Sequence, residues 1–217
     1  MGYGFKLKVW GTYACFTRPE MKVERVSYDV ITPSSARGVL EAIYWKPSIA
    51  WKIEKIHVLN EIKFENLRRN EVGNKILLQN IKKAMEKGAA LYQVANEDRQ
   101  QRASLLLRDV AYIIEAHFEM TDKKGERDSQ EKHYAIAKRR MENGQCYHRP
   151  YLGCREFPAQ FELIENEIPN GFYTNKTIDL GWMLYDIDFN KNMKAIFYRA
   201  RMENGIIKVP DESDVKR

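Results

Sequence analysis

Residues 32–46 read TPSSARGVLEAIYWK and predict the helix around which the rest of the chain is arranged. Thr32 can accept a hydrogen bond from the first free amide groups, and Pro33 fits the first helical position because no amide hydrogen is needed there. Pro47 restricts the residue before it, so the helix ends at or before Lys46. Apolar residues recur at helical spacing and predict one face packed on a sheet; they are Ala36, Val39, Leu40 and Ile43.

Strands are predicted on both sides of this helix. Residues 5–10 read FKLKVW, residues 51–58 read WKIEKIHV, and residues 62–67 read IKFENL. Alternation of apolar and polar residues is typical of half-buried strands. The last two runs are separated by a short polar turn and predict a hairpin. Strand, helix, strand, strand is the first half of a ferredoxin-like or RNA-recognition-motif (RRM) domain.

Residues 68–103 interrupt this pattern with polar and charged sequence. A short helix fits residues 76–85, and a run of charged and amide residues follows it over 96–102. We expect these residues to form a basic insertion that is either mobile or ordered by bound RNA.

The remaining chain predicts a second sheet. Strand character returns over 105–120, a helix fits 131–141, and short strands with Asn-Gly turns continue to residue 210. We therefore predict an α+β protein, with an RRM/ferredoxin-like domain over 1–144 and an appended small antiparallel β-sheet domain over 145–217.

Composition favours a polyanionic partner. The chain has 217 residues, of which 36 are Lys or Arg and 30 are Asp or Glu, which leaves a formal net charge of +6. A sequence pI near 9.1 favours nucleic acid through long-range attraction. Many basic proteins bind no nucleic acid, so charge alone does not decide the function.

The three cysteines, Cys15, Cys146 and Cys154, predict reduced thiols. Their count is odd, and the 7 residues between the last two match no common zinc motif. No apolar run approaches the ~18 residues that span a bilayer, and the N-terminus lacks the order of a signal peptide. We expect a cytoplasmic protein with no metal, cofactor or membrane partner.

The motifs of several enzyme classes are absent from the sequence. It contains no Walker-type phosphate loop, no Gly-x-Ser-x-Gly elbow and no histidines at metal-ligand spacing. RNA can be cut without metal when a base removes the 2′-hydroxyl proton, an acid protonates the leaving 5′-oxygen, and a cation stabilises the phosphate. Histidine, with a reference pKa of about 6.5, suits the proton transfers, and lysine or arginine suits the last role.

The residues alone do not choose among the four histidines. His57, near a strand end, is expected to be structural or on the surface, and His133, at a polar helix start, to be solvated. His148 precedes Arg149 and could contact a phosphate. His117 follows an apolar run, where the ordinary interpretation is a strand histidine satisfied by hydrogen bonds.

Tyr44 is also open to two interpretations. Trp45 could be the core anchor at the helix end, which would leave Tyr44 facing outward. A phenol with a reference pKa of about 10 can orient a nucleophile but is a poor base unaided. Lys46 is either an ordinary surface lysine or a phosphate contact.

Several segments together resemble the Dvulg subtype (type I-C) of the Cas-five family of CRISPR-associated proteins. The match runs in order along nearly the whole chain. Its segments are WGTYACFTRPE (10–20), SYDVITPSSARG (27–38), EAIYWKP (41–47), 97–102 leading into 111–118, YLGCREF (151–157) and MENG (202–205). The resemblance implies an RRM-like N-terminal domain and a C-terminal β-sheet domain. It also implies an endoribonuclease that cuts the CRISPR repeat hairpin without metal and then stays on the guide RNA within the Cascade complex.

The resemblance implies catalytic residues as well. The tyrosine of the family corresponds to Tyr44 and its histidine to His117. Some members carry a lysine immediately before the histidine, where this chain has Ala116. We take Tyr44, His117 and Lys46 as the expected catalytic set, with Lys123 or Arg37 as other sources of the positive charge.

In the expected mechanism, His117 is the general base or acid and Tyr44 positions the 2′-hydroxyl or the phosphate. The products are a 5′-hydroxyl and a 2′,3′-cyclic phosphate. Basic residues are expected to hold the RNA largely through phosphate and shape; they are Arg37, Arg99, Arg102, Lys123, Arg149 and Arg155.

Three rival hypotheses remain. A non-catalytic Cascade subunit that holds the crRNA 5′ handle is favoured slightly by Ala116. A small-molecule enzyme on the same fold would need a pocket motif, which we do not find. Duplex DNA binding as a secondary function is permitted by the positive charge.

Overall fold

The computed structural model describes residues 4–189, 191–211 and 214–215, which form three helices and nine strands. All of these strands belong to one sheet with the order β6-β1-β5-β3-β9-β8-β7, and β2 and β4 also pair with β5. Every pairing is antiparallel except the short contact of β2 with β5. The elements are β1 (Gly4–Ala14), β2 (Arg25–Val26), α1 (Pro33–Ile43), β3 (Ile49–Val58), β4 (Lys63–Val72), α2 (Leu78–Lys87), β5 (Arg99–Met120), α3 (Gln130–Glu142), β6 (Gln160–Leu163), β7 (Thr177–Asp188), β8 (Lys194–Glu203) and β9 (Ile206–Lys208).

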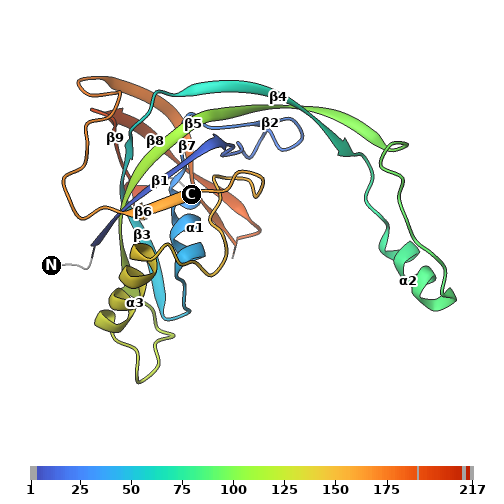
Figure 1. Ribbon diagram of the computed structural model, residues 1–217, viewed down its shortest axis with the longest axis horizontal. Coiled ribbons are helices and arrows are strands. Elements are labelled where there is room, and N and C mark those ends of the chain that lie inside the picture. The colour runs from blue at the N-terminus through green and yellow to red at the C-terminus, as the bar shows by residue number, and fades with distance from the viewer. Residues whose placement is uncertain (1–3, 190, 212–213, 216–217) are drawn as a thin grey trace.

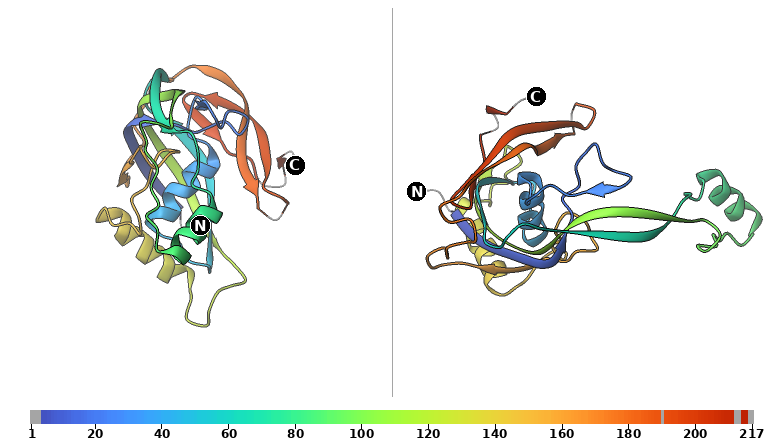
Figure 2. Two further views of the ribbon diagram at one scale, coloured as in Figure 1. Left: turned by 90° about the vertical axis from the view of Figure 1, so that its right-hand side faces the viewer. Right: turned by 90° about the horizontal axis from the view of Figure 1, so that it is seen from above.

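Helix α1 begins as the sequence predicts. The Thr32 hydroxyl accepts a hydrogen bond from the Ser35 amide at 3.2 Å, and Pro33 occupies the first turn. The helix ends at Ile43, before Lys46. Its apolar face is buried, and α1 lies inside the curled sheet, where it contacts β3 and β7 (Figure 2).

Strand β5 spans 22 residues and connects two parts of the molecule. Its second half pairs with β1 and β3 in the body, whereas Arg99 to Arg108 pair with β4. The resulting two-stranded ribbon projects from the body and carries α2 at its end (Figure 1). We call residues 63–108 the arm.

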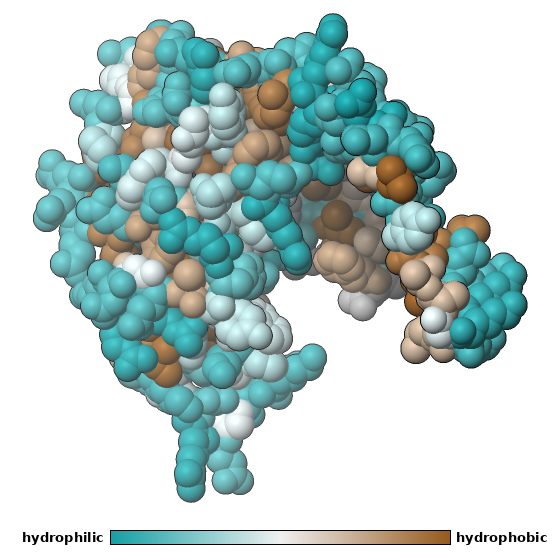
Figure 3. Space-filling view, turned by 45° about the vertical axis from the view of Figure 1, so that its right-hand side comes forward, coloured by the Kyte–Doolittle hydropathy of each residue, from teal (hydrophilic) through white to brown (hydrophobic). Residues whose placement is uncertain are grey.

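The predicted hairpin between residues 51–58 and 62–67 is wrong. Strand β4 pairs with β5 and not with β3, because one edge of β3 already pairs with β5 and part of the other pairs with β9. Residues 68–103 include the end of β4, helix α2 and the start of β5, and α2 confirms the short helix with a shift of two residues. That RNA orders this segment stays a prediction. No residue of α2 is buried, and apolar side chains are visible on the arm in Figure 3.

The C-terminal strands extend the same sheet. Strand β6 pairs with β1, and β9 pairs with β3, so hydrogen bonds cross the predicted boundary at residue 144. The α+β class is confirmed, as is a helix near 131–141. The ferredoxin-like description and the division at residue 144 stay predictions. None of the helices in the described residues has the length and apolar content that a bilayer crossing needs.

Candidate active site

His117 lies on β5 beside an irregularity in its neighbour β3. The pairing of the two strands shifts register between Ile53 and Lys55, so Glu54 is an extra residue in β3. The bulge brings a carboxylate oxygen of Glu54 to 2.5 Å from Nδ1 of His117. Bulges commonly re-aim a side chain in this way. The contact fixes the orientation of the imidazole ring.

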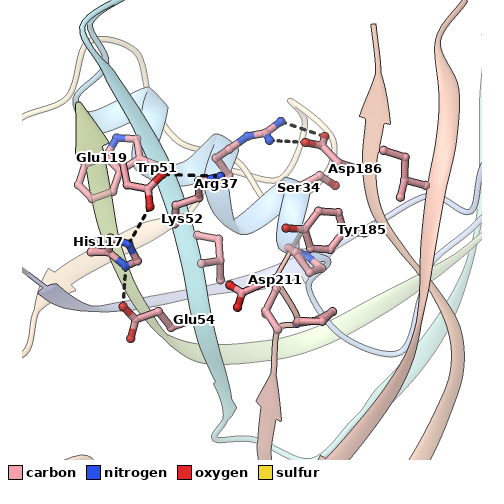
Figure 4. A pocket seen from close by; sticks show the side chains of 15 residues that line it. Ser34, Arg37, Trp51, Lys52, Glu54, His117, Glu119, Tyr185, Asp186 and Asp211 are labelled. Atoms are coloured by element: carbon pink, nitrogen blue, oxygen red, sulfur yellow. Dashed lines mark hydrogen bonds and ion pairs between the residues drawn. The ribbon is translucent and has the colours of Figure 1, made fainter. Parts of the chain in front are cut away.

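His117 lines a hollow of about 310 Å³ between β3, β5, α1 and the strands β7 and β8, and its other ring nitrogen is directed toward Glu119 (Figure 4). The His117 side chain is 30% exposed, and its Nε2 lies 3.9 Å from a carboxylate oxygen of Glu119. With Nδ1 held by Glu54, Nε2 is the atom available to exchange a proton with a group in the hollow. We call this space the His117 hollow; among its lining residues are Arg37, Lys52, Glu54, His117, Glu119 and Asp186.

Position 116, where some family members carry a lysine, points away from the hollow in this chain. Neighbouring strand residues point to opposite faces of a sheet, and Ala116 is buried, with 2% of its surface exposed. The register instead places Lys52 of β3 directly opposite His117 and therefore on the same face. The ammonium of Lys52 lies 3.9 Å from Glu119. Sequence reasoning missed Lys52 because it needs the pairing register to be found.

Arg37 lies in the same hollow, but carboxylates engage its charge. Its two terminal nitrogens donate to the two carboxylate oxygens of Asp186, and its Nε lies 3.4 Å from Glu41. Burial lowers the pKa of Arg37, but its hydrogen bonds to Asp186 together with the charges of Asp186 and Glu41 raise it overall, so the guanidinium stays charged. Arg37 therefore lines the same hollow as His117, but its charge is already paired with Asp186.

Tyr44 is buried, with 1% exposed, whereas Trp45 is 53% exposed. The expectation that Trp45 is the core anchor and Tyr44 faces outward is wrong. Tyr44 has extended backbone, with φ −149° and ψ 118°, and successive side chains of extended chain point to opposite sides. Its carbonyl also accepts a hydrogen bond from the indole of Trp51 at 2.8 Å.

The Tyr44 hydroxyl lies 2.7 Å from Nδ1 of His133. His133 is buried with 1% exposed, so the expectation that it is solvated is wrong. Its Nε2 lies 3.1 Å from the Ser48 hydroxyl and 3.5 Å from a carboxylate oxygen of Asp128. These partners bring the end of α1, the start of β3 and the first turn of α3 together, which explains why a histidine on a polar helix turns inward.

Burial sets the charge of this cluster. It raises the pKa of Tyr44 and lowers the pKa of His133, so both side chains are neutral near pH 7. The charge of the exposed Lys46 also acts to lower the pKa of His133. Tyr44 and Lys46 therefore lie with His133, and no hydrogen bond within the described ranges connects them to His117. The structure does not assemble the expected set of Tyr44, Lys46 and His117 at one point.

The other two histidines fit simpler roles. His57 is 9% exposed and its Nε2 lies 2.5 Å from Glu115, which confirms a structural position. Burial raises the pKa of Glu115, but the hydrogen bonds from His57 and Lys55 outweigh it and lower that pKa. His148 is exposed on the loop after α3. Whether it contacts a phosphate stays a prediction.

Apart from Arg37, which lines the His117 hollow, the basic residues predicted to hold RNA are spread over three surfaces. Arg99 and Arg102 lie on the arm, Lys123 lies in the loop before α3, and Arg149 and Arg155 lie in the loops after α3. Arg102 is half-buried and donates to Gln100 at 2.6 Å, and the other four are exposed. These positions could follow the backbone of an extended RNA, but they do not converge on the His117 hollow.

Comparison with known proteins places the chain in a family. A sequence profile described as CRISPR-associated protein (Cas_Cas5), Cas5d, matches residues 4–210. The chain belongs to the Cas5d family. The chain is 52% identical to the CRISPR pre-crRNA endoribonuclease Cas5d of Mannheimia succiniciproducens over the full length of both proteins. The protein of that name from Thermus thermophilus is 42% identical over 95% of this chain and 91% of its own length. The resemblance drawn from the sequence is confirmed.

Solved structures agree with the fold of this Cas5d family member. One described as a CRISPR-associated protein has a TM-score of 0.75 and 25% identity, and it covers 99% of this chain and 95% of its own. A functionally uncharacterized protein from Streptococcus mutans has a TM-score of 0.73 and 24% identity, with the same coverage. The overall fold is thus shared with experimentally solved structures.

Proposed function

We propose that this chain is an endoribonuclease that cuts the CRISPR repeat hairpin of pre-crRNA. It then stays on the crRNA 5′ handle within a type I-C Cascade complex in the cytoplasm. The observation that carries this proposal is the 52% identity, over full length, to a protein named CRISPR pre-crRNA endoribonuclease. The net charge of +6 suits an RNA partner.

The cleavage proceeds without a metal ion. His117 removes the 2′-hydroxyl proton through Nε2, and the 2′-oxygen attacks the adjacent phosphorus. The bond from phosphorus to the 5′-oxygen breaks, and that oxygen takes up a proton from water. The products are a 2′,3′-cyclic phosphate and a 5′-hydroxyl. The 2.5 Å contact with Glu54 supports this role because it holds the ring in one orientation.

Lys52 supplies the positive charge that the family lysine supplies elsewhere. It lies opposite His117 on the same sheet face and lines the same hollow. A phosphate entering the hollow would compete with Glu119 for its ammonium, which lies 3.9 Å from that carboxylate. Lys52 would then stabilise the charge that develops on the phosphate.

Tyr44 acts as a positioning residue in this proposal. Its hydroxyl is buried and engaged by His133, so it holds the end of α1 and the start of β3, the strand that carries Lys52 and Glu54. Lys46, Arg99, Lys123, Arg149 and Arg155 contact the RNA outside the hollow, mainly at phosphates.

A non-catalytic handle-binding subunit is the second candidate function. The observation that favours it is the acidity of the hollow, which contains Glu54, Glu119, Asp186 and Asp211. Four carboxylates around one histidine repel a phosphate unless basic groups or bound RNA compensate. Under this alternative His117 is a strand histidine held by Glu54.

The decisive experiment is cleavage of the cognate repeat RNA in EDTA, with the 3′ ends identified. The variants are His117→Ala, Lys52→Ala, Lys52→Arg and, as a matched control, the exposed His148→Ala. We expect cyclic phosphate ends from the wild type, a loss of at least about 100-fold for His117→Ala, since general acid–base catalysis contributes that much, and partial rescue by Lys52→Arg. His148→Ala should still cut.

Two other outcomes would change the assignment. Tight RNA binding by the wild type without cutting supports the handle-binding subunit. Cutting that survives His117→Ala but not His133→Gln, in a variant that remains folded, moves the catalytic centre to the Tyr44 cluster.

A further inference from the structure

Two of the three cysteines lie against each other at the junction of the body and the arm. The Cys15 amide, just after β1, donates to the carbonyl of Leu152 at 3.0 Å. The Sγ of Cys154 lies 3.6 Å from the carbonyl oxygen of Cys15. Gly153 makes this approach possible, because a Cβ built on it would lie 2.0 Å from that oxygen, and its φ of +85° suits glycine. Backbone packing therefore holds the Cys154 thiol against the backbone of Cys15, whose own Sγ lies 3.5 Å from the Thr17 hydroxyl.

A guanidinium completes the cluster. Nη1 of Arg25 lies 3.5 Å from Sγ of Cys154 and 3.1 Å from a carboxylate oxygen of Glu156. Arg25 and Glu156 in turn form ion pairs with Glu71 and Arg69 of β4, at 3.9 Å and 2.8 Å. These are the charged groups that face Cys154 from β2, from β4 and from its own loop.

The surroundings shift the pKa values of the two thiols in opposite directions. The hydrogen bond from Cys15 and the charge of Arg25 lower the pKa of Cys154 to about 6, against the opposing effects of burial and of Glu156. The same hydrogen bond, together with burial, raises the pKa of Cys15. A thiolate next to a protonated thiol is the arrangement of an attacking and a resolving cysteine.

We propose that Cys154 is an activated thiol that reacts with peroxides and small electrophiles, and that Cys15 resolves the oxidised form as a disulfide. The Cys154 thiolate attacks one peroxide oxygen, the O–O bond breaks, and the leaving hydroxide is protonated to water. This gives a sulfenic acid at Cys154. Sγ of Cys15 then attacks that sulfur, the S–O bond breaks, and the Cys15 proton leaves with the hydroxyl as a second water. Two thiols lose two electrons and the peroxide gains them.

This site does not depend on the proposed ribonuclease function. It uses neither His117 nor any group in the His117 hollow. Oxidation would replace the contact between Cys154 and Arg25 by a covalent bond between the end of β1 and the 151–159 loop, next to the exposed Arg155.

The first test is alkylation of the full-length folded protein by iodoacetamide between pH 5 and 9, followed by peptide mapping. We expect the rate at Cys154 to be half-maximal near pH 6, where its pKa lies. The variant Arg25→Gln should shift this half-point upward and slow alkylation at pH 6.5 by at least threefold, with Arg25→Lys restoring part of the rate. Cys146 in the same maps is the internal standard for unfolding. A half-point above pH 8, or no effect of Arg25→Gln, overturns the proposal.

The second test is treatment with hydrogen peroxide. We expect a peptide crosslinked between Cys15 and Cys154 in the wild type and in Cys146→Ser, and its loss on addition of dithiothreitol. The variant Cys15→Ser should instead accumulate a sulfenic acid at Cys154 that dimedone traps. Peroxide that leaves Cys154 unmodified, or that links it to Cys146, refutes the assignment.

Discussion

The Tyr44→Phe variant tests how the buried Tyr44 hydroxyl acts. The change removes one oxygen and leaves Nδ1 of His133 without its partner at 2.7 Å. The ring itself stays, together with the guanidinium of Arg140 that lies 5.2 Å from its centroid. A buried donor or acceptor left unsatisfied costs about 1–3 kcal/mol. We therefore expect the free energy of unfolding to fall by about 1–3 kcal/mol.

The assay is urea unfolding followed by fluorescence, with single-turnover cutting of repeat RNA measured on the same samples. Tyr147→Phe is the matched control, because Tyr147 is 83% exposed, and an exposed substitution should change stability by less than about 0.5 kcal/mol. The cutting rate per folded molecule should change far less in Tyr44→Phe than in His117→Ala, because a positioning residue does not touch the RNA.

A double-variant cycle makes the test sharper. In a His133→Leu background the hydrogen-bond partner of Tyr44 is already gone, so Tyr44→Phe should cost at least about 0.5 kcal/mol less than it does alone. Two results would refute the reasoning: additive losses in the cycle, or a more than tenfold loss of cutting by a Tyr44→Phe protein of unchanged stability. The second would mean that the hydroxyl reaches the RNA.

Four further predictions follow from the fold. Burial holds the pKa of His133 below the 6.5 of an unfolded chain, so the unfolded state binds the proton first; stability to urea should fall as pH drops below 6.5, and His133→Gln should reduce that slope. Gly153→Ala should lower the melting temperature more than Gly88→Ala. Both glycines have positive φ, but an added Cβ would lie 2.0 Å from the Cys15 carbonyl oxygen at Gly153 and would meet no atom within 4 Å at Gly88. Thr32→Ala removes the α1 cap and should cost about 1 kcal/mol in urea unfolding. Replacing residues 74–97 by a short glycine linker should leave the thermal transition of the body nearly unchanged, because α2 buries no residue.

Local patterns in the sequence predicted local structure well. The start of α1 depends on Thr32, Pro33 and Ser35, all within one turn, and the structure confirms it. The partner of β4 could not be found in this way. Alternation marks residues 62–67 as a strand, but its partner depends on which edges β3 has left open, and β9 is far away in sequence.

In the candidate site as well, local features could be predicted from the sequence, whereas contacts between distant segments could not. His117 was identified through its motif, but Glu54 became its partner through a bulge, and a bulge does not interrupt the sequence pattern visibly. Alternation along a strand was a usable signal that position 116 faces away from His117. Tyr44 rather than Trp45 is buried because Tyr44, just after the helix, has extended backbone. The spacing of apolar residues in the sequence does not indicate this.

Strand β5 runs without a break from the body into the arm, so a change in backbone angle where it leaves the body would move the whole arm. Asp109 has a φ of 52°, which is uncommon outside glycine, and it lies where β5 leaves the body and begins to pair with β4. Ten residues of strand beyond it reach about 33 Å. A rotation of about 10° at Asp109 would therefore displace the start of α2 by about 6 Å. The length of the paired strands thus sets the reach of the arm, and the backbone at Asp109 lies where its direction from the body is decided.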